Sequence, residues 1–228
     1  MRILLVAATW LEAKPLMSDL WFLRKFSGNL YSFRYTEHRV DVLVTGVGML
    51  ATSHGVTKAL DKTKYALAIN AGICGSFSAD FEPGSVVNVH EECQPEFGIT
   101  DSNGFTPIVD VGFDTSLPEH FKETVVSNPH HNQIIGFKHL PYARGATVNH
   151  MDLTGKSHTS LLAKLNPQVE TMEGIGFFYP CMARGIPFIQ VRAVSNYVGM
   201  QDKSEWAIEL AIENLKRTVY EAMVAMPK

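Results

Sequence analysis

Three polar side chains stand where stretches of predicted strand come to an end: Glu12, Glu173 and Asn196. A carboxylate in such a position can accept a proton from water or hydrogen bonds from hydroxyl groups, and an amide offers both a donor and an acceptor. Each residue also has an ordinary structural explanation, because carboxylates favour helix N-termini and Asn favours turns. Their chemistry therefore depends on whether the fold brings them together.

A glycine-rich segment, Gly72-Ile73-Cys74-Gly75, follows the apolar run 66–70 and predicts a turn. Glycine there would let a ligand approach the backbone closely, although a plain connection between two elements explains the segment equally well. The glycine spacing is not that of a dinucleotide-binding fingerprint, and no Gly-Lys-Ser/Thr follows as it does in a P-loop. The segment is therefore a candidate ligand contact, but it matches no motif that would indicate which ligand binds.

Short apolar runs alternate with helical patterns along the whole chain. Strands are predicted at 3–7, 30–35, 40–45, 66–70, 86–90, 133–137, 144–149, 169–172 and 187–194. Helices are predicted at 11–20, 48–60, 115–126, 152–165, 173–184 and 203–226, and a long loop at 91–110. This alternation predicts a single three-layer α/β/α domain over residues 1–228, with a mixed, largely parallel central sheet. Ligands of such sheets bind beyond the carboxyl ends of the strands, where the candidate residues lie.

Composition excludes several classes of function. The formal net charge of −3 provides no basic footprint for nucleic acid or a membrane surface, and no apolar run reaches the ~20 residues of a membrane span. The cysteines, Cys74, Cys93 and Cys181, are too few and too widely spaced for a disulfide framework or a metal site. We expect free thiols, a cytoplasmic location, and neither a metal nor a cofactor.

Four segments in order along the chain resemble the nucleoside phosphorylase and nucleosidase superfamily. They are Thr45-Gly46-Val47-Gly48, Asn70 to Gly75, Thr171-Met172-Glu173 and Arg192-Ala193-Val194-Ser195-Asn196. The resemblance implies a nucleoside phosphorylase-like fold and a ribose site at Met172 and Glu173. It implies catalytic roles for Glu12, which matches the water-activating Glu of methylthioadenosine/S-adenosylhomocysteine nucleosidases, and for Asn196. The substrate-binding residues that it implies are Gly72, Ile73, Cys74, Gly75, Val148, Asn149, Thr171, Met172, Glu173 and Ser195.

Two departures from the family pattern carry information. The adenine-specific relatives have Asp where this chain has Asn196. An amide can donate to O6 of a 6-oxopurine and accept from N7–H, whereas the amino group of adenine would face the amide donor, so we expect a preference for hypoxanthine. The phosphate-binding loop of the phosphorylases is also missing, and Glu12 stands in its place. This favours hydrolysis over phosphorolysis.

With a preference for a 6-oxopurine, the segments 170–174 (Glu-Thr-Met-Glu-Gly) and 192–199 (Arg-Ala-Val-Ser-Asn-Tyr-Val-Gly), followed by Trp206, resemble the futalosine hydrolase family, which serves menaquinone biosynthesis. The resemblance implies futalosine as the small-molecule partner and a homodimer or higher homo-oligomer. Phe97 and Phe105, or a neighbouring subunit, would line a pocket for the 5′ aromatic group. The alternatives are a nucleosidase that releases adenine, a purine nucleoside phosphorylase, and a purine-binding protein without catalysis.

Overall fold

A mixed sheet of ten strands runs through the computed structural model, which describes residues 1–26, 28–102, 104–153 and 164–227. Its order is β11-β10-β6-β12-β5-β1-β4-β3-β2, and β9 pairs with β6. The strands are β1 (Arg2–Ala7), β2 (Trp21–Lys25), β3 (Leu30–Tyr35), β4 (His38–Val44), β5 (Leu67–Ser76), β6 (Val86–Cys93), β9 (Val125–Ser127), β10 (Tyr142–Thr147), β11 (Val169–Thr171) and β12 (Phe188–Tyr197). A separate hairpin consists of β7 (Gly98–Asp101) and β8 (Gly104–Pro107).

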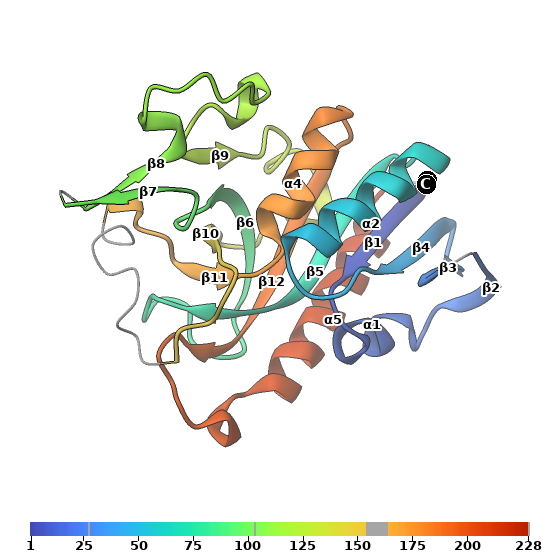
Figure 1. Cartoon of the computed structure of the whole chain (residues 1–228). Helices are drawn as coiled ribbons and strands as arrows, with labels where there is room; N and C mark the ends of the chain where they lie inside the picture. Colours follow the sequence, from blue (N-terminus) through green and yellow to red (C-terminus); the bar gives the residue numbers. More distant parts are fainter. Residues whose placement is uncertain (27, 103, 154–163, 228) are drawn as a thin grey trace.

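Helices cover both faces of the sheet (Figure 1). They are α1 (Trp10–Met17), α2 (Met49–Lys62), α4 (Gly174–Ala183) and α5 (Ile208–Ala225). Alternate residues of β1 face opposite layers: Ile3 and Leu5 join the core formed with α1 and α5, and Leu4 and Val6 join the core formed with α2 and α4. The prediction of an α/β fold with a mixed central sheet is confirmed, and the single domain over 1–228 stays a prediction.

One end of the sheet curls back on itself. Strand β11 pairs with β10 on one side and antiparallel with β5 on the other, so β5, β12, β6, β10 and β11 form a ring. Within this ring Gly75 of β5 pairs with Glu170 of β11 and with Asn196 of β12. The curl therefore brings polar side chains from three distant parts of the sequence to one place.

The predicted turn at Gly72–Gly75 is wrong, because these residues continue β5 to Ser76. Strand β12 likewise runs through Ser195 and Asn196, with a register shift between Val194 and Asn196. Hydrogen bonding from neighbouring strands on both sides outweighs the loop preference of glycine here.

The region between β6 and β10 differs most from the sequence-based prediction. Residues 91–110 include the end of β6 and the β7–β8 hairpin, and the helix predicted at 115–126 is a short 3-10 turn (Glu119–Phe121) followed by β9. Strand β9 forms there because β-branched Val125 and Val126 pair with β6.

Two predicted elements and one strand that was not predicted also differ from the sequence-based expectation. Residues 133–137 contain a 3-10 turn (Ile135–Phe137) in place of a strand, because Gly136 packs directly on the backbone of Ala222 in α5. Strand β2 was not predicted, since all five of its residues are exposed and show no alternation. The helix predicted at 152–165 falls largely on 154–163, outside the described residues. No helix in the described ranges is both long and apolar enough to cross a membrane.

Candidate active site

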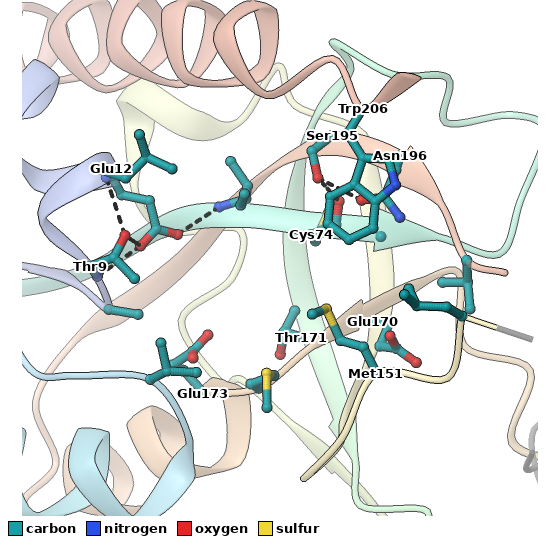
Figure 2. A pocket seen from close by; sticks show the side chains of 18 of the residues that line it. Thr9, Glu12, Cys74, Met151, Glu170, Thr171, Glu173, Ser195, Asn196 and Trp206 are labelled. Atoms are coloured by element: carbon teal, nitrogen blue, oxygen red, sulfur yellow. Dashed lines mark hydrogen bonds between the residues drawn. The ribbon is translucent and has the colours of Figure 1, made fainter. Parts of the chain in front are cut away.

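A pocket opens where β1, β5 and β12 end, as the sheet topology predicts. Its walls come from residues 8, 9, 11, 12, 73–75, 151–153, 170–173, 195, 196, 198 and 199, together with Val47 and Trp206. Glu12 and Glu173 lie at one end of the pocket, and Asn196, Trp206, Met151 and Glu170 lie at the other (Figure 2). Parts of the chain that are far apart in sequence thus share one cavity.

Glu12 is both a helix-capping residue and a wall of the pocket. Its Oε2 accepts hydrogen bonds from the backbone N–H of Thr9 over 2.9 Å and from the Thr9 hydroxyl over 2.7 Å, and the Thr9 side chain in turn caps α1. Its Oε1 accepts from the backbone N–H of Ile73 over 3.1 Å. Only 4% of Glu12 is exposed. The ordinary explanation for this residue is therefore correct, and it places the carboxylate beside the cavity.

Glu173 stands at the start of α4 and is also buried. Its Oε1 accepts from the backbone N–H of Gly48 over 3.0 Å, and its Oε2 lies 3.4 Å from Nη2 of Arg192. Gly48 has φ of 97°, a left-handed conformation that favours glycine, and this turns its N–H towards the carboxylate. The segment 45–48 therefore serves to position Glu173.

Arg192 supplies the positive charge beneath the two carboxylates. It is 1% exposed, and within the described ranges its Nε and Nη2 atoms have no hydrogen-bond partner. A Cβ atom on Gly72 would lie 2.6 Å from Oε1 of Glu12 and would also collide with Nη1 of Arg192. Gly72 does not line the pocket, contrary to the predicted role, but it leaves the space that these two side chains occupy.

The amide of Asn196 is held in one orientation. Its Nδ2 donates to the carbonyl oxygen of Tyr197 over 3.0 Å, and because a carbonyl only accepts, the nitrogen must be on that side. Its Oδ1 lies 2.7 Å from the hydroxyl of Ser195, which is also 3.2 Å from the carbonyl oxygen of Cys74. One amide N–H and one lone pair on Oδ1 remain for a ligand.

The remaining predicted contacts are divided between the pocket and its surroundings. Residues that line the pocket are Ile73, Cys74, Gly75, Thr171, Met172 and Ser195. Burial raises the pKa of the Cys74 thiol to about 12, so the thiol stays neutral and is a poor nucleophile at neutral pH.

Val148 and Asn149 do not reach the pocket. Val148 is buried, and its backbone N–H donates to the carbonyl of Thr171 over 2.9 Å. Asn149 is exposed, and both its backbone and its side chain donate to Glu96. Strand β10 ends at Thr147 and the chain turns outward there, so that Met151 lines the pocket instead.

Phe97 and Phe105 also lie elsewhere. Phe97 lines a second pocket together with Phe121 and Tyr179, and Phe105 packs against the small core around Cys93 and Ala146. Neither aromatic ring belongs to the pocket of Glu12 within this chain. The prediction for the 5′ group therefore rests on a neighbouring subunit.

Two buried glutamates near the site were not identified from the sequence. Glu170 lines the pocket, and its position two residues before Met172 on a strand is a signal that alternation could have provided. Glu92 lies behind Glu173 and accepts hydrogen bonds from Thr147 over 2.8 Å and from Gln190 over 2.6 Å. Burial raises its pKa to about 7. No sequence motif surrounds Glu92, because its partners come from other strands. Across the residues with described positions, no three His, Cys, Asp or Glu side chains are grouped as metal ligands.

The chain is similar to known proteins over most of its length. Residues 2–224 match the family model of the phosphorylase superfamily. A futalosine hydrolase of Streptomyces coelicolor is 32% identical over 201 residues, which cover 81% of this chain and 80% of the relative. A futalosine hydrolase of Thermus thermophilus is 24% identical over 93% of this chain and 88% of the relative.

Solved structures share the fold over nearly the whole chain. Futalosine hydrolase of Helicobacter pylori superimposes with a TM-score of 0.82 at 14% identity, covering 99% of this chain and 98% of that one. An S-adenosylhomocysteine nucleosidase of Streptococcus pyogenes gives a TM-score of 0.78 at 17% identity, covering 100% and 98%. The chain therefore belongs to the phosphorylase superfamily and, within it, to the futalosine hydrolase family.

Proposed function

We propose that this chain hydrolyses the N-glycosidic bond of futalosine and releases hypoxanthine and dehypoxanthine futalosine, a step of menaquinone biosynthesis. The observation that carries the proposal is the held amide of Asn196 in the same pocket as Glu12 and Glu173. The Streptomyces relative bears the name of this activity at 32% identity.

Cleavage develops positive charge on the ribose and negative charge on the departing base. Glu12 accepts a proton from the water whose oxygen attacks C1′, while the electron pair of the C1′–N9 bond moves to the purine. Glu173 accepts hydrogen bonds from the ribose hydroxyls and stabilises the cationic sugar. Nη2 of Arg192 lies 3.4 Å from Oε2 of Glu173, and this ion pair holds the carboxylate in place beside the ribose. Met172 packs against the sugar.

The base is selected at the other end of the pocket. The free N–H of Asn196 donates to O6, and its remaining lone pair accepts from N7–H. The departing base takes this proton from solvent water, and Glu12 returns its own proton to solvent. Adenine presents an amino donor where O6 would be, which leaves two donors facing each other in a buried site and costs about 1–3 kcal/mol. This favours hypoxanthine release over the adenine release of the related nucleosidases.

One assay separates the competing functions. The protein is incubated with futalosine, methylthioadenosine and inosine, with and without phosphate, and the released base and sugar are identified. We expect hypoxanthine from futalosine at a rate that does not depend on phosphate. Faster release of adenine from methylthioadenosine, or a phosphorylated sugar product, would exclude the proposal.

We also propose that the protein is a homo-oligomer in the cytoplasm. Large apolar side chains stand exposed at and near the pocket mouth, with 56% of Leu11, 55% of Val47 and 85% of Leu50 accessible, and such a cluster fits an interface with a second copy. The three cysteines are free and buried, which fits a reducing compartment. Light scattering after size-exclusion chromatography tests the oligomer, and a mass equal to one chain would contradict it.

A further inference from the structure

The carboxylate of Glu170 has no role in the mechanism above, yet it faces the pocket. Only 8% of the residue is exposed. Within the described ranges no hydrogen bond or ion pair reaches its carboxylate, although Glu12, Glu92 and Glu173 each accept at least two polar contacts. A buried carboxylate without a donor is costly, so this position points to a donor on the ligand.

The strand pairing shows which part of the ligand this is. Glu170 and Asn196 both pair with Gly75, one from each side, so their side chains project to the same face of the sheet. They are two strand spacings apart, roughly 10 Å between backbones, and the glycine between them has no side chain to fill the gap. Figure 2 shows both residues at the end of the pocket away from Glu12 and Glu173.

We propose that Glu170 is a specificity-determining residue that accepts a hydrogen bond from N1–H of the 6-oxopurine base. The inference rests on the proposed function, in which Asn196 binds O6 and N7. N1 is the ring atom next to C6, which carries O6, so a second polar group facing Asn196 across Gly75 is placed to meet it. Hypoxanthine carries a hydrogen on N1, whereas adenine has a lone pair there that an ionised carboxylate repels.

The local electrostatics agree with this role. Burial, together with the negative charges of Asp152 and Glu96, raises the pKa of Glu170 to about 7. An N–H donor from the base would stabilise the ionised form of the carboxylate and so lower that pKa. A structural role would require a protein donor, and a metal site would require further ligands, which the described residues do not group here.

Binding of the free bases tests the proposal without using turnover. Calorimetry with hypoxanthine and adenine compares the unmodified protein, Glu170→Leu, Glu170→Gln and a surface control, Glu213→Gln. We expect Glu170→Leu to weaken hypoxanthine binding by about ten- to a hundredfold and to leave adenine binding unchanged or stronger. Glu170→Gln, whose amide can present either a donor or an acceptor to N1, should bring the two affinities together, and Glu213→Gln should change neither.

The outcomes are separable. The inference is overturned if folded Glu170→Leu changes the affinities for both bases equally, or leaves the ratio of hypoxanthine to adenine affinity unchanged. It is also overturned if the unmodified protein does not bind hypoxanthine. If Glu170→Leu does not fold, an unchanged ratio in Glu170→Gln overturns it. Futalosine hydrolysis is assayed in parallel. Selective loss of hypoxanthine binding in a protein that does not hydrolyse futalosine would contradict the proposed substrate and leave the role of Glu170 supported.

Discussion

The backbone N–H of Ile73 donates a 3.1 Å hydrogen bond to Oε1 of Glu12, and so joins the start of α1 to strand β5 across 61 positions of sequence. Thr9 holds the other carboxylate oxygen. The contacts with Thr9 cap α1, and the contact with Ile73 fixes the other oxygen, so together they orient Glu12 towards the pocket. The residue thus stabilises the start of the helix and stands where the proposed base is needed.

Replacement of Glu12 by Gln should separate these two contributions. The amide keeps the size of the side chain and loses the proton acceptor, so we expect futalosine hydrolysis to fall by about a hundredfold or more while the fold persists. Hypoxanthine release is the measurement. The comparison Thr9→Ala removes the cap, costing about 1 kcal/mol of stability, and one hydrogen bond to Glu12, but it keeps the carboxylate, so hydrolysis should fall much less than in Glu12→Gln. Full turnover by Glu12→Gln would exclude Glu12 as the base.

Replacement of Asn196 by Asp should shift the choice of base. In Asp the atom that replaces Nδ2 is an oxygen, which bonds to the carbonyl of Tyr197 only when it carries a proton and which can accept from the amino group of adenine through a lone pair. We expect the ratio of kcat/KM for the adenine-bearing analogue of futalosine over futalosine to rise by about tenfold or more. An unchanged ratio would show that Asn196 does not select the base.

Glu92 should make stability depend on pH in a specific window. Its pKa rises from 4.5 in the unfolded chain to about 7, chiefly because burial removes water and also because Glu173 carries a like charge. The hydrogen bonds from Thr147 and Gln190 and the positive charge of Arg192 oppose this rise. The folded state therefore binds the proton more tightly, and the stability contributed by the protonated form is complete below pH 4.5 and lost as pH rises through about 7.

Glu92→Gln removes this titration. In denaturant unfolding at several pH values, the free energy of unfolding of the variant should rise relative to that of the unmodified protein between pH 4.5 and about 7, by ~1.4 kcal/mol for each unit of the pKa difference. Other titrating groups, including Glu170, are present in both proteins and cancel in the comparison. A stability difference that is constant with pH would contradict the raised pKa.

Replacement of Gly72 by Ala should displace the buried side chains of Glu12 or Arg192. The new Cβ would lie 2.6 Å from Oε1 of Glu12 and collide with Nη1 of Arg192, so at least one of these buried groups must move. We expect a loss of stability of about 1–3 kcal/mol and a larger loss of hydrolysis. The control is Gly55→Ala in α2, a helix that buries only some of its residues, and this variant should retain hydrolysis. If Gly72→Ala has the same free energy of unfolding and the same rate of hydrolysis as the unmodified protein, the backbone adapts to the new side chain and the prediction is wrong.

The sequence alone determined the fold class and most of the residues that meet in the pocket, because strand ends of an α/β sheet gather at one edge. Glu12, Glu173 and Asn196 were found in this way, since local pattern places each at or near a strand end. Features that depend on pairing between distant segments could not be predicted from the sequence. The extension of β5 through Gly75, the strand β9 and the outward turn at Asn149 all depend on partners far along the chain.

Only the tertiary structure decided which side chains face one another. The curl that pairs β11 with β5 sets Glu170 opposite Asn196 across Gly75, and neither residue carries a local signal of that contact. Burial likewise distinguishes Glu92 from the adjacent, partly exposed Glu91, because desolvation depends on what packs around a carboxylate and not on its neighbours in sequence. Residue types set the available chemistry, and strand pairing and burial select the groups that can perform it.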